Sequence, residues 1–433
     1  MPALNKAAAC LGLFLLLFMR PVTASAQPRA RDRVTASAQD TELIVKVRDR
    51  ASRLPVEALR AAGAETGASM RSDSRFKLVR VHSPRQTAVL MRELAADPEI
   101  EYVEANQTAA ALFTPNDPYF INGAQWNLRQ VKAPAAWDID PGAGDGVIVA
   151  VLDTGVAYED YNDGMQTYSR MPDLSATTFV PGWDCVSEDD HPNDDNGHGT
   201  HVAGVIAQTT NNGYGAAGLA FGARIMPVKV LNKYGFGDSF NVAEGIRWAA
   251  DHGAKVINLS LGFDRPSLAV KEAVDYARNV KKVTLIAAAG NDAENPRYAG
   301  GLMYPARYSS VISVGATRYG KKRAAYSQYG SALDIMAPGG EMGLGLDMNS
   351  DGYPDGIVQE TIGGFYWAEG TSLAAPHVAA AAAMVIAGGV TRPAGVYRAL
   401  TRGATDLGRK GRDTRYGYGL LNVAAALRRQ PVN

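Results

Sequence analysis

Four residues of this 433-residue sequence have side chains that together could perform nucleophilic catalysis. Ser372 opens an alanine-rich apolar segment, where its hydroxyl would lie among the free N–H groups of a helix N-terminus. His198 carries an imidazole that can accept a hydroxyl proton near neutral pH, and Asp153 carries a carboxylate that can hold this imidazole in one tautomer. Asn291 supplies an amide donor that can stabilise a developing oxyanion.

Each of these residues also has an ordinary structural explanation. Ser372 and its neighbours can form a helix cap, and Asp153 and Asn291 can be turn residues. His198 and His201 could indicate zinc, but no glutamate lies between them, and the sequence has only six histidines and two cysteines. We therefore expect no zinc site, and the joint occurrence of the four residue types favours catalysis.

Short apolar runs alternate with helical patterns from residue 131 onward. The apolar runs cover residues 147–152, 223–231, 255–261, 283–289, 311–314 and 333–336. Helices are expected from residue 198, over residues 239–252 and over residues 267–281. This alternation predicts a three-layer α/β fold, with a mostly parallel sheet covered by helices on both faces. Ligands bind at the carboxyl ends of such strands, where Asp153 and Asn291 stand.

The composition is that of a globular protein without a dominant charge. Hydrophobic residues make up 46% and charged residues 20%, while Lys plus Arg and Asp plus Glu both total 44. This balance offers no basic field for nucleic acid or for an anionic membrane surface, so neither partner is expected. Cys10 would be removed with a signal peptide, which leaves Cys185 without an internal disulfide partner.

The N-terminus has the residue order of a secretory signal peptide. Lys6 precedes an apolar run over residues 7–19, and small residues follow at 24–26. The run is too short to span a bilayer, and no later segment is long and uncharged enough to do so. We therefore expect a signal peptide over residues 1–26 and a linker over residues 27–40. The protein would be secreted to the periplasm or the extracellular medium, with no membrane span after processing.

A separate small pattern covers residues 41–106. Strands are expected over residues 41–48, 75–82 and 99–104, and helices over residues 55–62 and 86–97. This order predicts a small α+β domain. The aperiodic residues 107–116 that follow form an accessible boundary, so a second domain is expected over residues 117–433.

Five segments resemble, in the same order, the motif set of the subtilisin-like serine proteases. They are VAVLDTGV (149–156), NGHGTHVAG (196–204), VINLSLG (256–262), AAAGN (287–291) and GTSLAAPHV (370–378). The resemblance extends from residue 117 to residue 427 and implies the subtilisin-like fold and a serine endopeptidase.

The resemblance also implies a role for each of the four residues. Asp153 would orient the imidazole, His198 would be the general base and then the acid, and Ser372 would be the nucleophile. Asn291 and the Ser372 backbone N–H would form the oxyanion hole. Leu373 stands where the family usually has methionine, which is a volume-conserving difference.

Two segments would form the walls of the pocket for the substrate residue before the scissile bond. By the same resemblance they are Ser260, Leu261 and Gly262 on one side and Ala287, Ala288, Ala289 and Gly290 on the other. Small residues on both walls suit a large apolar or aromatic side chain, whereas Asp292 could admit a basic one. Tyr304 and Pro305 match a family position at which the proline is cis.

Residues 41–106 resemble the propeptide of these proteases, most clearly in the segment DPEIEYVEAN (97–106). This resemblance implies a ferredoxin-like domain that acts as an intramolecular chaperone and inhibitor. Self-cleavage is expected between Asn106 and Pro115.

An acidic loop between Asn291 and Ser372 has the residue pattern of a calcium site. The expected ligands are Asp347, Asn349, Asp351, the carbonyl of Tyr353, and Asp355, with Gly352 at the sharp turn. Position 12 of the pattern is Val358, so Glu360 is the candidate for the missing carboxylate. Asp173, in the segment MPDL, resembles a family calcium ligand, although the acidic residues around it also suit a solvated loop. A bound ion would stabilise a fold that has no disulfide.

These observations predict a monomeric, secreted serine endopeptidase that hydrolyses proteins and peptides through an acyl-enzyme on Ser372. It would be processed from a precursor that its own propeptide inhibits, and no organic cofactor is expected. His377 is expected to be a buried structural residue. Two alternatives are a catalytically inactive exported binding or scaffold protein with the same fold, and a dedicated processing protease with few substrates.

Overall fold

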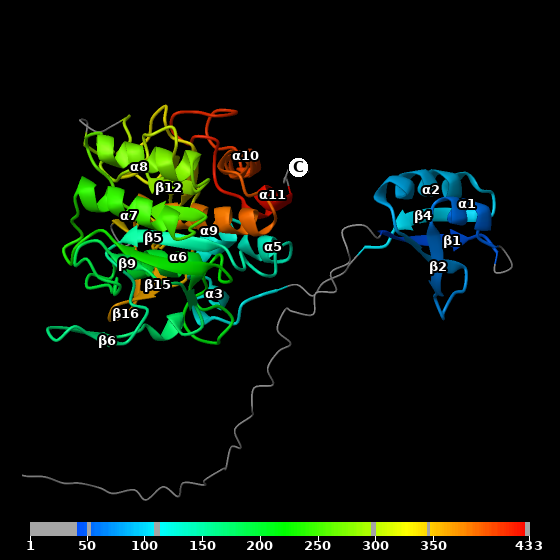
Figure 1. The fold of residues 1–433 in the computed structure, drawn as a ribbon, viewed down its shortest axis with the longest axis horizontal. Helices are drawn as coiled ribbons and strands as arrows, with labels where there is room; N and C mark the ends of the chain where they lie inside the picture. The colour runs from blue at the N-terminus through cyan, green and yellow to red at the C-terminus, as the bar shows by residue number, and fades with distance from the viewer. Residues whose placement is uncertain (1–40, 50–52, 108–112, 296–299, 344–346, 429–433) are drawn as a thin grey trace, which may run out of the picture. The chain divides into compact units, whose positions relative to one another are not determined.

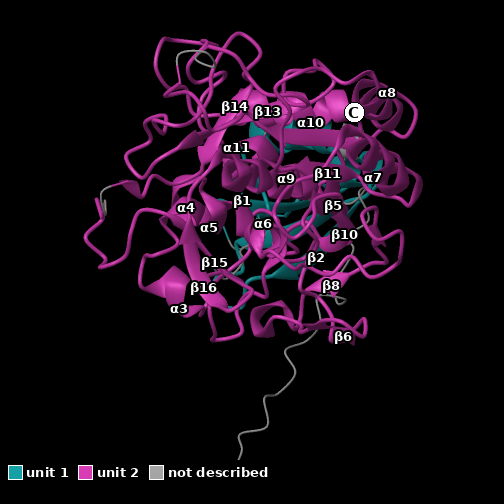
Figure 2. Ribbon diagram, turned by 90° about the vertical axis from the view of Figure 1, so that its left-hand side faces the viewer, with its two compact units in different colours: residues 1–109 teal, residues 110–433 magenta. Residues whose placement is uncertain are grey.

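The computed structural model describes residues 41–49, 53–107, 113–295, 300–343 and 347–428. The chain divides into two compact units, residues 1–109 and residues 110–433, which Figure 2 colours separately. The expected signal peptide and linker lie outside the described residues. None of the helices in the described ranges is long and apolar enough to cross a membrane.

The first unit is a four-stranded antiparallel sheet with two helices, and its strand order is β2-β3-β1-β4. Its elements are β1 (Thr41–Val47), α1 (Val56–Ala61), β2 (Ala64–Ser69), β3 (Phe76–Val81), α2 (Pro84–Ala96) and β4 (Ile100–Ala105). This order of elements is the ferredoxin-like arrangement, so the predicted α+β fold is confirmed. Strand β2 is absent from the prediction because its side chains are small or polar and almost all exposed, which leaves no apolar alternation.

The second unit is built on an eight-stranded sheet of order β14-β13-β12-β11-β5-β10-β8, with β9 also paired to β10. Its strands are β5 (Ile148–Asp153), β8 (Thr178–Phe179), β9 (Trp183–Asp184), β10 (Arg224–Lys229), β11 (Val256–Leu259), β12 (Thr284–Ala288), β13 (Ile312–Thr317) and β14 (Ile335–Pro338). All pairings between these strands are parallel. Each of the six predicted apolar runs overlaps one of these strands, because helices cover both faces of the sheet.

Helices cover the two faces of this sheet, as the three-layer prediction requires. One face packs against α6 (His198–Ala207) and α9 (Thr371–Ala387), and α10 (Pro393–Gly403) and α11 (Val423–Arg428) pack against α9 in the same core. The other face packs against α7 (Ser239–Asp251) and α8 (Leu268–Asn279). Figure 1 shows α7 and α6 on opposite sides of β5.

Helix α9 lies closest to the centre of the sheet, where it contacts β5, β11, β12, β13 and β14. Its residues 373–385 are buried, and seven of these thirteen are alanine. Because an alanine side chain ends at Cβ, the helix can approach the strands closely. The position of this helix therefore determines where its first residues lie relative to the strand ends.

Side-chain caps fix the starts of α7 and α8. Asp238 accepts the N–H groups of Phe240 and Asn241 at 2.9 Å each. Ser267 accepts the N–H of Val270 at 3.4 Å. Such caps stabilise a helix by about 1 kcal/mol each.

Several short elements of the second unit have no counterpart in the sequence prediction. They are α3 (Pro118–Ile121), α4 (Trp126–Gln130), α5 (Ala133–Trp137), β6 (Tyr161–Asn162), β7 (Thr167–Tyr168), the 3-10 helix η1 (Pro172–Leu174), β15 (Ile357–Thr361) and β16 (Gly364–Ala368). Elements of this length are too short for an apolar period to be detected. The expected cis peptide bond is present between Tyr304 and Pro305.

Candidate active site

Asp153 and His198 form a hydrogen-bonded pair at the carboxyl edge of the central sheet. Asp153 ends β5, and His198 begins α6. The Oδ1 atom of Asp153 lies 2.7 Å from Nδ1 of His198, and the Asp153 side chain is fully buried. Because a carboxylate accepts this bond, Nδ1 carries the proton and Nε2 of His198 is left unprotonated in the neutral ring.

Four effects set the pKa of His198. Burial disfavours the charged imidazole, but the negative charge of Asp153 and the hydrogen bond to it outweigh burial and raise the pKa above 6.5. Asp194 raises this pKa further. The Asp194 carboxylate accepts the N–H groups of Gly197 and Thr200 at 2.9 Å each, and it thereby holds the start of α6 in place.

Ser372 lies in the first turn of α9, which begins at Thr371. The N–H groups of a first turn have no acceptor within the helix, and the helix dipole is positive there. The Ser372 carbonyl accepts a hydrogen bond from the Ser260 hydroxyl at 2.6 Å, and Ser260 accepts one from Asn258 Nδ2 at 2.9 Å. These bonds join the start of α9 to the end of β11.

Asn291 presents its amide nitrogen near the Ser372 hydroxyl. Its Oδ1 accepts the backbone N–H of Thr371 at 2.9 Å and the Thr371 hydroxyl at 2.8 Å. Because a backbone N–H can only donate, the atom facing Thr371 is the oxygen, and Nδ2 is the free donor. A Cβ on Gly370 would lie 2.9 Å from Ser372 Oγ and 3.4 Å from Asn291 Nδ2. Both atoms therefore border one small space that only glycine at position 370 keeps open.

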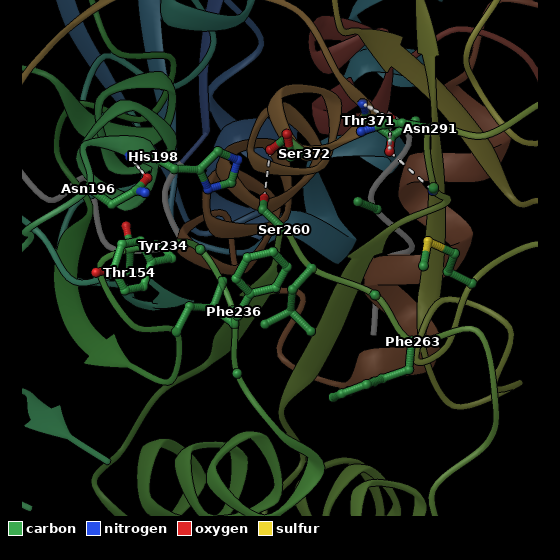
Figure 3. Close-up of a pocket in the computed structure, with 18 of the residues that line it drawn as sticks. Thr154, Asn196, His198, Tyr234, Phe236, Ser260, Phe263, Asn291, Thr371 and Ser372 are labelled. Atoms are coloured by element: carbon green, nitrogen blue, oxygen red, sulfur yellow. Dashed lines mark hydrogen bonds between the residues drawn. The ribbon is translucent and has the colours of Figure 1, made fainter. Parts of the chain in front are cut away.

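A single cleft of about 490 Å³ contains His198, Asn291 and Ser372. In Figure 3 the His198 imidazole and the Ser372 side chain point toward one another. Among the residues that the structure describes, no hydrogen bond joins Nε2 of His198 to Oγ of Ser372. Catalytic hydrogen bonds of this kind often shorten only when substrate is bound. The structure thus brings the four sequence-predicted residues together at one strand edge.

The ends of β11 and β12 form two walls of this cleft. The wall residues are Ser260, Leu261, Gly262, Ala288 and Gly290. Ala287 and Ala289 instead lie in the core on the opposite face, with α7 and α8. Alternate side chains of a strand point to opposite faces, so successive alanines cannot all line one wall. The prediction that Ala287 and Ala289 line the pocket is therefore wrong.

The cleft also contains residues that the sequence prediction did not include. Thr371 accepts the N–H of Gly290 at 3.1 Å in addition to its bonds to Asn291, so it links α9 to β12. Tyr234 and Phe236 line the cleft with side chains that are mostly exposed (Figure 3). Tyr234 and Phe236 are separated by Gly235 and follow the buried strand β10. This pattern was the sequence signal that could have indicated aromatic residues at the edge of the cleft.

Two further histidines near the site are structural. Burial lowers the pKa of His201 and of His377 to about 4, so both rings are neutral near pH 7. His377 donates from Nδ1 to the Leu373 carbonyl and accepts from Asn127 Nδ2, both at 2.8 Å. His377 is thus buried as predicted, and it ties the first turns of α9 to α4.

The predicted calcium loop is closed on itself by hydrogen bonds. Asp347 accepts the N–H groups of Asp351 and Gly352 at 3.1 and 3.0 Å, and Asn349 Nδ2 donates to Asp351 at 2.7 Å. Tyr353 donates its N–H to Asp351 at 2.8 Å. Within the described ranges, no three carboxylate, imidazole or thiolate groups lie close enough together to hold a metal ion.

Asp355 is the most buried carboxylate of this loop. One of its oxygens accepts the N–H of Met348 at 2.9 Å, and the other, Oδ1, is buried with no hydrogen-bond partner among the described residues. Burial raises the pKa of Asp355, and the charges of Asp347 and Asp351 raise it further. The positive charge of a bound cation would oppose both burial and the two neighbouring negative charges, and it would therefore lower the pKa of Asp355.

Glu360 and Asp173 meet each other and do not contribute to this loop. Glu360 accepts the Asp173 backbone N–H at 2.6 Å, so the expectation that it completes the calcium loop is wrong. Asp173 accepts N–H groups from Gln208, Asn212 and Ala216 at 2.7–2.9 Å. Its burial nevertheless raises its pKa to about 7. Three donors thus occupy three of the roughly four acceptor sites of the Asp173 carboxylate.

Comparison with known proteins identifies the class of this chain. The Subtilase family pattern matches residues 144–419. The chain is 35% identical over 353 residues to the thermophilic serine proteinase of Bacillus sp. strain AK1, covering 81% of this chain and 78% of that protein. It is 39% identical over 317 residues to thermitase of Thermoactinomyces vulgaris, covering 73% and 99%. A solved protease structure from Pseudoalteromonas arctica PAMC 21717 superposes with a TM-score of 0.60 at 30% identity, covering 73% and 99%.

The chain therefore belongs to the subtilase family. It is a subtilisin-like serine endopeptidase, which acts on protein substrates. The prediction of a serine protease of this family is confirmed.

The raised pKa of His198 can be measured directly. In the Ser372→Ala variant of the full chain, which is expected to be stable against self-digestion, NMR of labelled histidine should show His198 titrating above pH 6.5. His201 and His377 should show no titration above pH 5, because burial keeps them neutral. Replacing Asp153 with Asn should lower the His198 pKa by removing the negative charge. An unchanged His198 pKa in that variant would contradict the electrostatic account.

Proposed function

We propose that Ser372 is the nucleophile of this endopeptidase, with His198 as its base and Asp153 as the carboxylate that orients the imidazole. The observation that carries the proposal is the 2.7 Å Asp153–His198 bond at the cleft that contains Ser372. Asp153 is buried and His198 is partly exposed toward the cleft, as an orienting acid and a working base require.

The proposed reaction is acyl transfer in two steps. The Ser372 Oγ attacks the carbonyl carbon of the scissile peptide bond, and its proton passes to His198 Nε2. His198 then protonates the departing amine, and Ser372 is left as an ester. Water, deprotonated by His198, hydrolyses this acyl-enzyme. The Asp153 charge stabilises the imidazolium that forms in each step.

The oxyanion would be bound by Asn291 Nδ2 and the backbone N–H of Ser372. Thr371 fixes Asn291 Oδ1 through two hydrogen bonds, so Nδ2 is oriented before the substrate arrives. Donors that are already oriented stabilise the developing charge without reorganisation.

We further propose that the first unit, residues 41–106, is an inhibitory propeptide. The contacts of Phe113 support a self-cleavage point on its N-terminal side. This point lies within residues 107–116, the predicted processing linker. The ring of Phe113 lies 5.7 Å from that of Trp137 and 5.6 Å from that of Phe221, and its backbone N–H donates to Asp138 at 3.2 Å. Phe113 thus already packs on the peptidase unit. Cleavage between Asn106 and Phe113 would leave this packing intact.

Export by the signal peptide of residues 1–26 is proposed from the residue order of that segment, which lies outside the described residues. The processed peptidase, residues 117–433 with the few residues before them, would then act outside the cytoplasm. Its substrates would be polypeptides that reach an open cleft.

Calcium is proposed as a structural ion at the loop of Asp347, Asn349, Asp351, Tyr353 and Asp355. The buried Oδ1 of Asp355, which has no hydrogen-bond partner among the described residues, supports this assignment. The ion would neutralise the acidic side chains that raise the pKa of Asp355. Its contribution would be to the stability of the loop, and it would take no part in the reaction.

Self-processing tests the nucleophile. The purified wild-type precursor should shorten on incubation to a chain that begins between residues 107 and 113, as N-terminal sequencing would show. The Ser372→Ala precursor should remain intact because it lacks the attacking oxygen. Equal shortening of both proteins, or none in the wild type, would contradict the proposal.

Replacing Asn291 with Ala removes one oxyanion donor. We expect kcat to fall by roughly 10²–10³, the magnitude found for subtilisin itself, while KM changes little. The measurement is steady-state hydrolysis of a peptide p-nitroanilide. An unchanged kcat would mean that Asn291 does not bind the oxyanion.

Chelation tests the calcium loop. In a Ser372→Ala background, which avoids self-digestion, a chelator should lower the melting temperature of the chain with the intact loop. An ion at 100 times its Kd stabilises a protein by about 2.7 kcal/mol, and the chelator removes this contribution. The matched variant with Asp351→Ala should respond less. Equal shifts in the two proteins would show that the ion, if bound, lies elsewhere.

A further inference from the structure

The amino edge of the central sheet, at the opposite end of its strands from the cleft, has two adjoining hollows lined by basic side chains. The larger, of about 440 Å³, is bordered by Arg278 at the end of α8, by Lys282 before β12 and by Arg392 before α10. The smaller, of about 320 Å³, is bordered by Arg278, Arg307 and Arg412. Because Arg278 borders both hollows, these five residues form one continuous surface, the basic face. Figures 1 and 2 show α8 and α10 near one another at the top of the second unit.

Little negative charge faces the two hollows. Asp334 is the only carboxylate among the described residues that line them. Its Oδ2 accepts the N–H and the hydroxyl of Ser313 at 3.1 and 3.2 Å, and its Oδ1 accepts the Tyr397 hydroxyl at 3.0 Å. Nη2 of Arg412 lies 3.7 Å from this Oδ1. Five cations and one carboxylate leave the basic face with a net charge of +4.

The cations of the basic face keep N–H donors available for a ligand. Arg307 and Arg392 are exposed, and neither side chain makes a hydrogen bond or an ion pair with another described residue. Arg278 and Arg412 donate to backbone carbonyls at 2.8–3.2 Å. Bonds to neutral carbonyls orient these two guanidinium groups without neutralising their charge.

The balanced composition of the whole chain conceals this local excess of positive charge. Residues 153–195 contain eleven Asp and Glu residues and one Arg. Residues 392–428 contain eight Lys and Arg residues and two Asp residues. A net charge of zero is thus the sum of separated acidic and basic segments, and a local field can attract an anionic partner that the net charge does not predict.

We propose that the basic face binds a flexible, linear polyanion that carries phosphate or sulfate groups. Four of its five cations are arginines, whose planar fork of N–H donors matches pairs of oxygens on such groups. Two hollows that meet at Arg278 suit successive charged groups along one chain, whereas a flat bilayer surface cannot enter them. Lys282 precedes the amino end of β12 and Asn291 follows its carboxyl end, so the bound polymer leaves the cleft open to substrate.

Calorimetric titration of the full-length Ser372→Ala chain tests the proposal. The probes are dextran sulfate and polyphosphate, which distinguish the two anionic groups, and uncharged dextran is the blank. We expect binding to at least one charged polymer, with an affinity that falls as salt rises. Replacing Arg307 and Arg392 together with Ala should lower the affinity at least tenfold in about 50 mM salt. The slope of log affinity against log salt should decrease by about two, because each lost cation removes about one unit.

The matched control removes two exposed cations at the cleft side of the same unit, Lys233 and Arg265, by changing both to Ala. This variant should keep the affinity and the salt slope. Thermal melting of each variant shows that folded proteins are compared. Failure of both charged polymers to bind would overturn the proposal, and so would an equal loss of affinity in the two double variants. Anionic lipid vesicles or duplex DNA that bind as tightly as the polymers would also overturn it.

A second measurement tests the separation of the basic face from the cleft. The enzyme that the full chain produces by its own processing should hydrolyse an uncharged peptide p-nitroanilide with the same kcat/KM in the presence and absence of saturating polymer. Inhibition by the polymer that the Arg307 and Arg392 changes do not relieve would place the binding site at the cleft and overturn the proposal. The titration uses a chain without Ser372, so its outcome is independent of the proposed reaction.

Discussion

The packing of the alanine-rich helix α9 on the parallel sheet is the constraint on which the site depends. The helix contacts five strands of the sheet, and half of its buried residues are alanine, so it can lie close to the strands. Ser372 stands in the first turn of this helix, and the Ser260 hydroxyl holds its carbonyl. A residue mounted in this way has little freedom to move relative to the strand ends. Larger side chains along α9 would lift the helix and shift Ser372 away from His198.

The charges around His198 determine whether its imidazole can act as a base once packing has placed it. Burial alone would make His198 a poor base for a reaction that passes through its charged form. The Asp153 carboxylate offsets that cost, and the pKa of His198 ends above its ordinary value. His201 and His377, which have no carboxylate partner and are more deeply buried than His198, have pKa values lowered to about 4 by burial. The neighbouring carboxylates and the greater exposure of His198 together distinguish it from these two buried rings.

Much of this architecture could be predicted from the sequence, because its signals are local. Six apolar runs marked six strands, and Asp153 and Asn291 followed two of them. What the sequence did not reveal depends on contacts between distant segments. Glu360 is close to the predicted calcium loop in the sequence, but in the fold its carboxylate accepts the backbone N–H of Asp173. No local sequence pattern indicates this contact. Strand alternation also places the three alanines 287–289 on two different faces of the sheet. The sequence segment AAAGN does not show this by itself.

The two hydrogen bonds from Thr371 to Asn291 join the start of α9 to the end of β12. They are made when the chain folds, whether or not a substrate is present. The free-energy cost of orienting the Asn291 dipole is therefore part of the stability of the fold and is absent from the activation barrier. An aspartate at position 291 would have nearly the same shape but would turn an acceptor toward the developing negative charge. One change of nitrogen to oxygen would thus leave the architecture standing while the chemical step becomes slower.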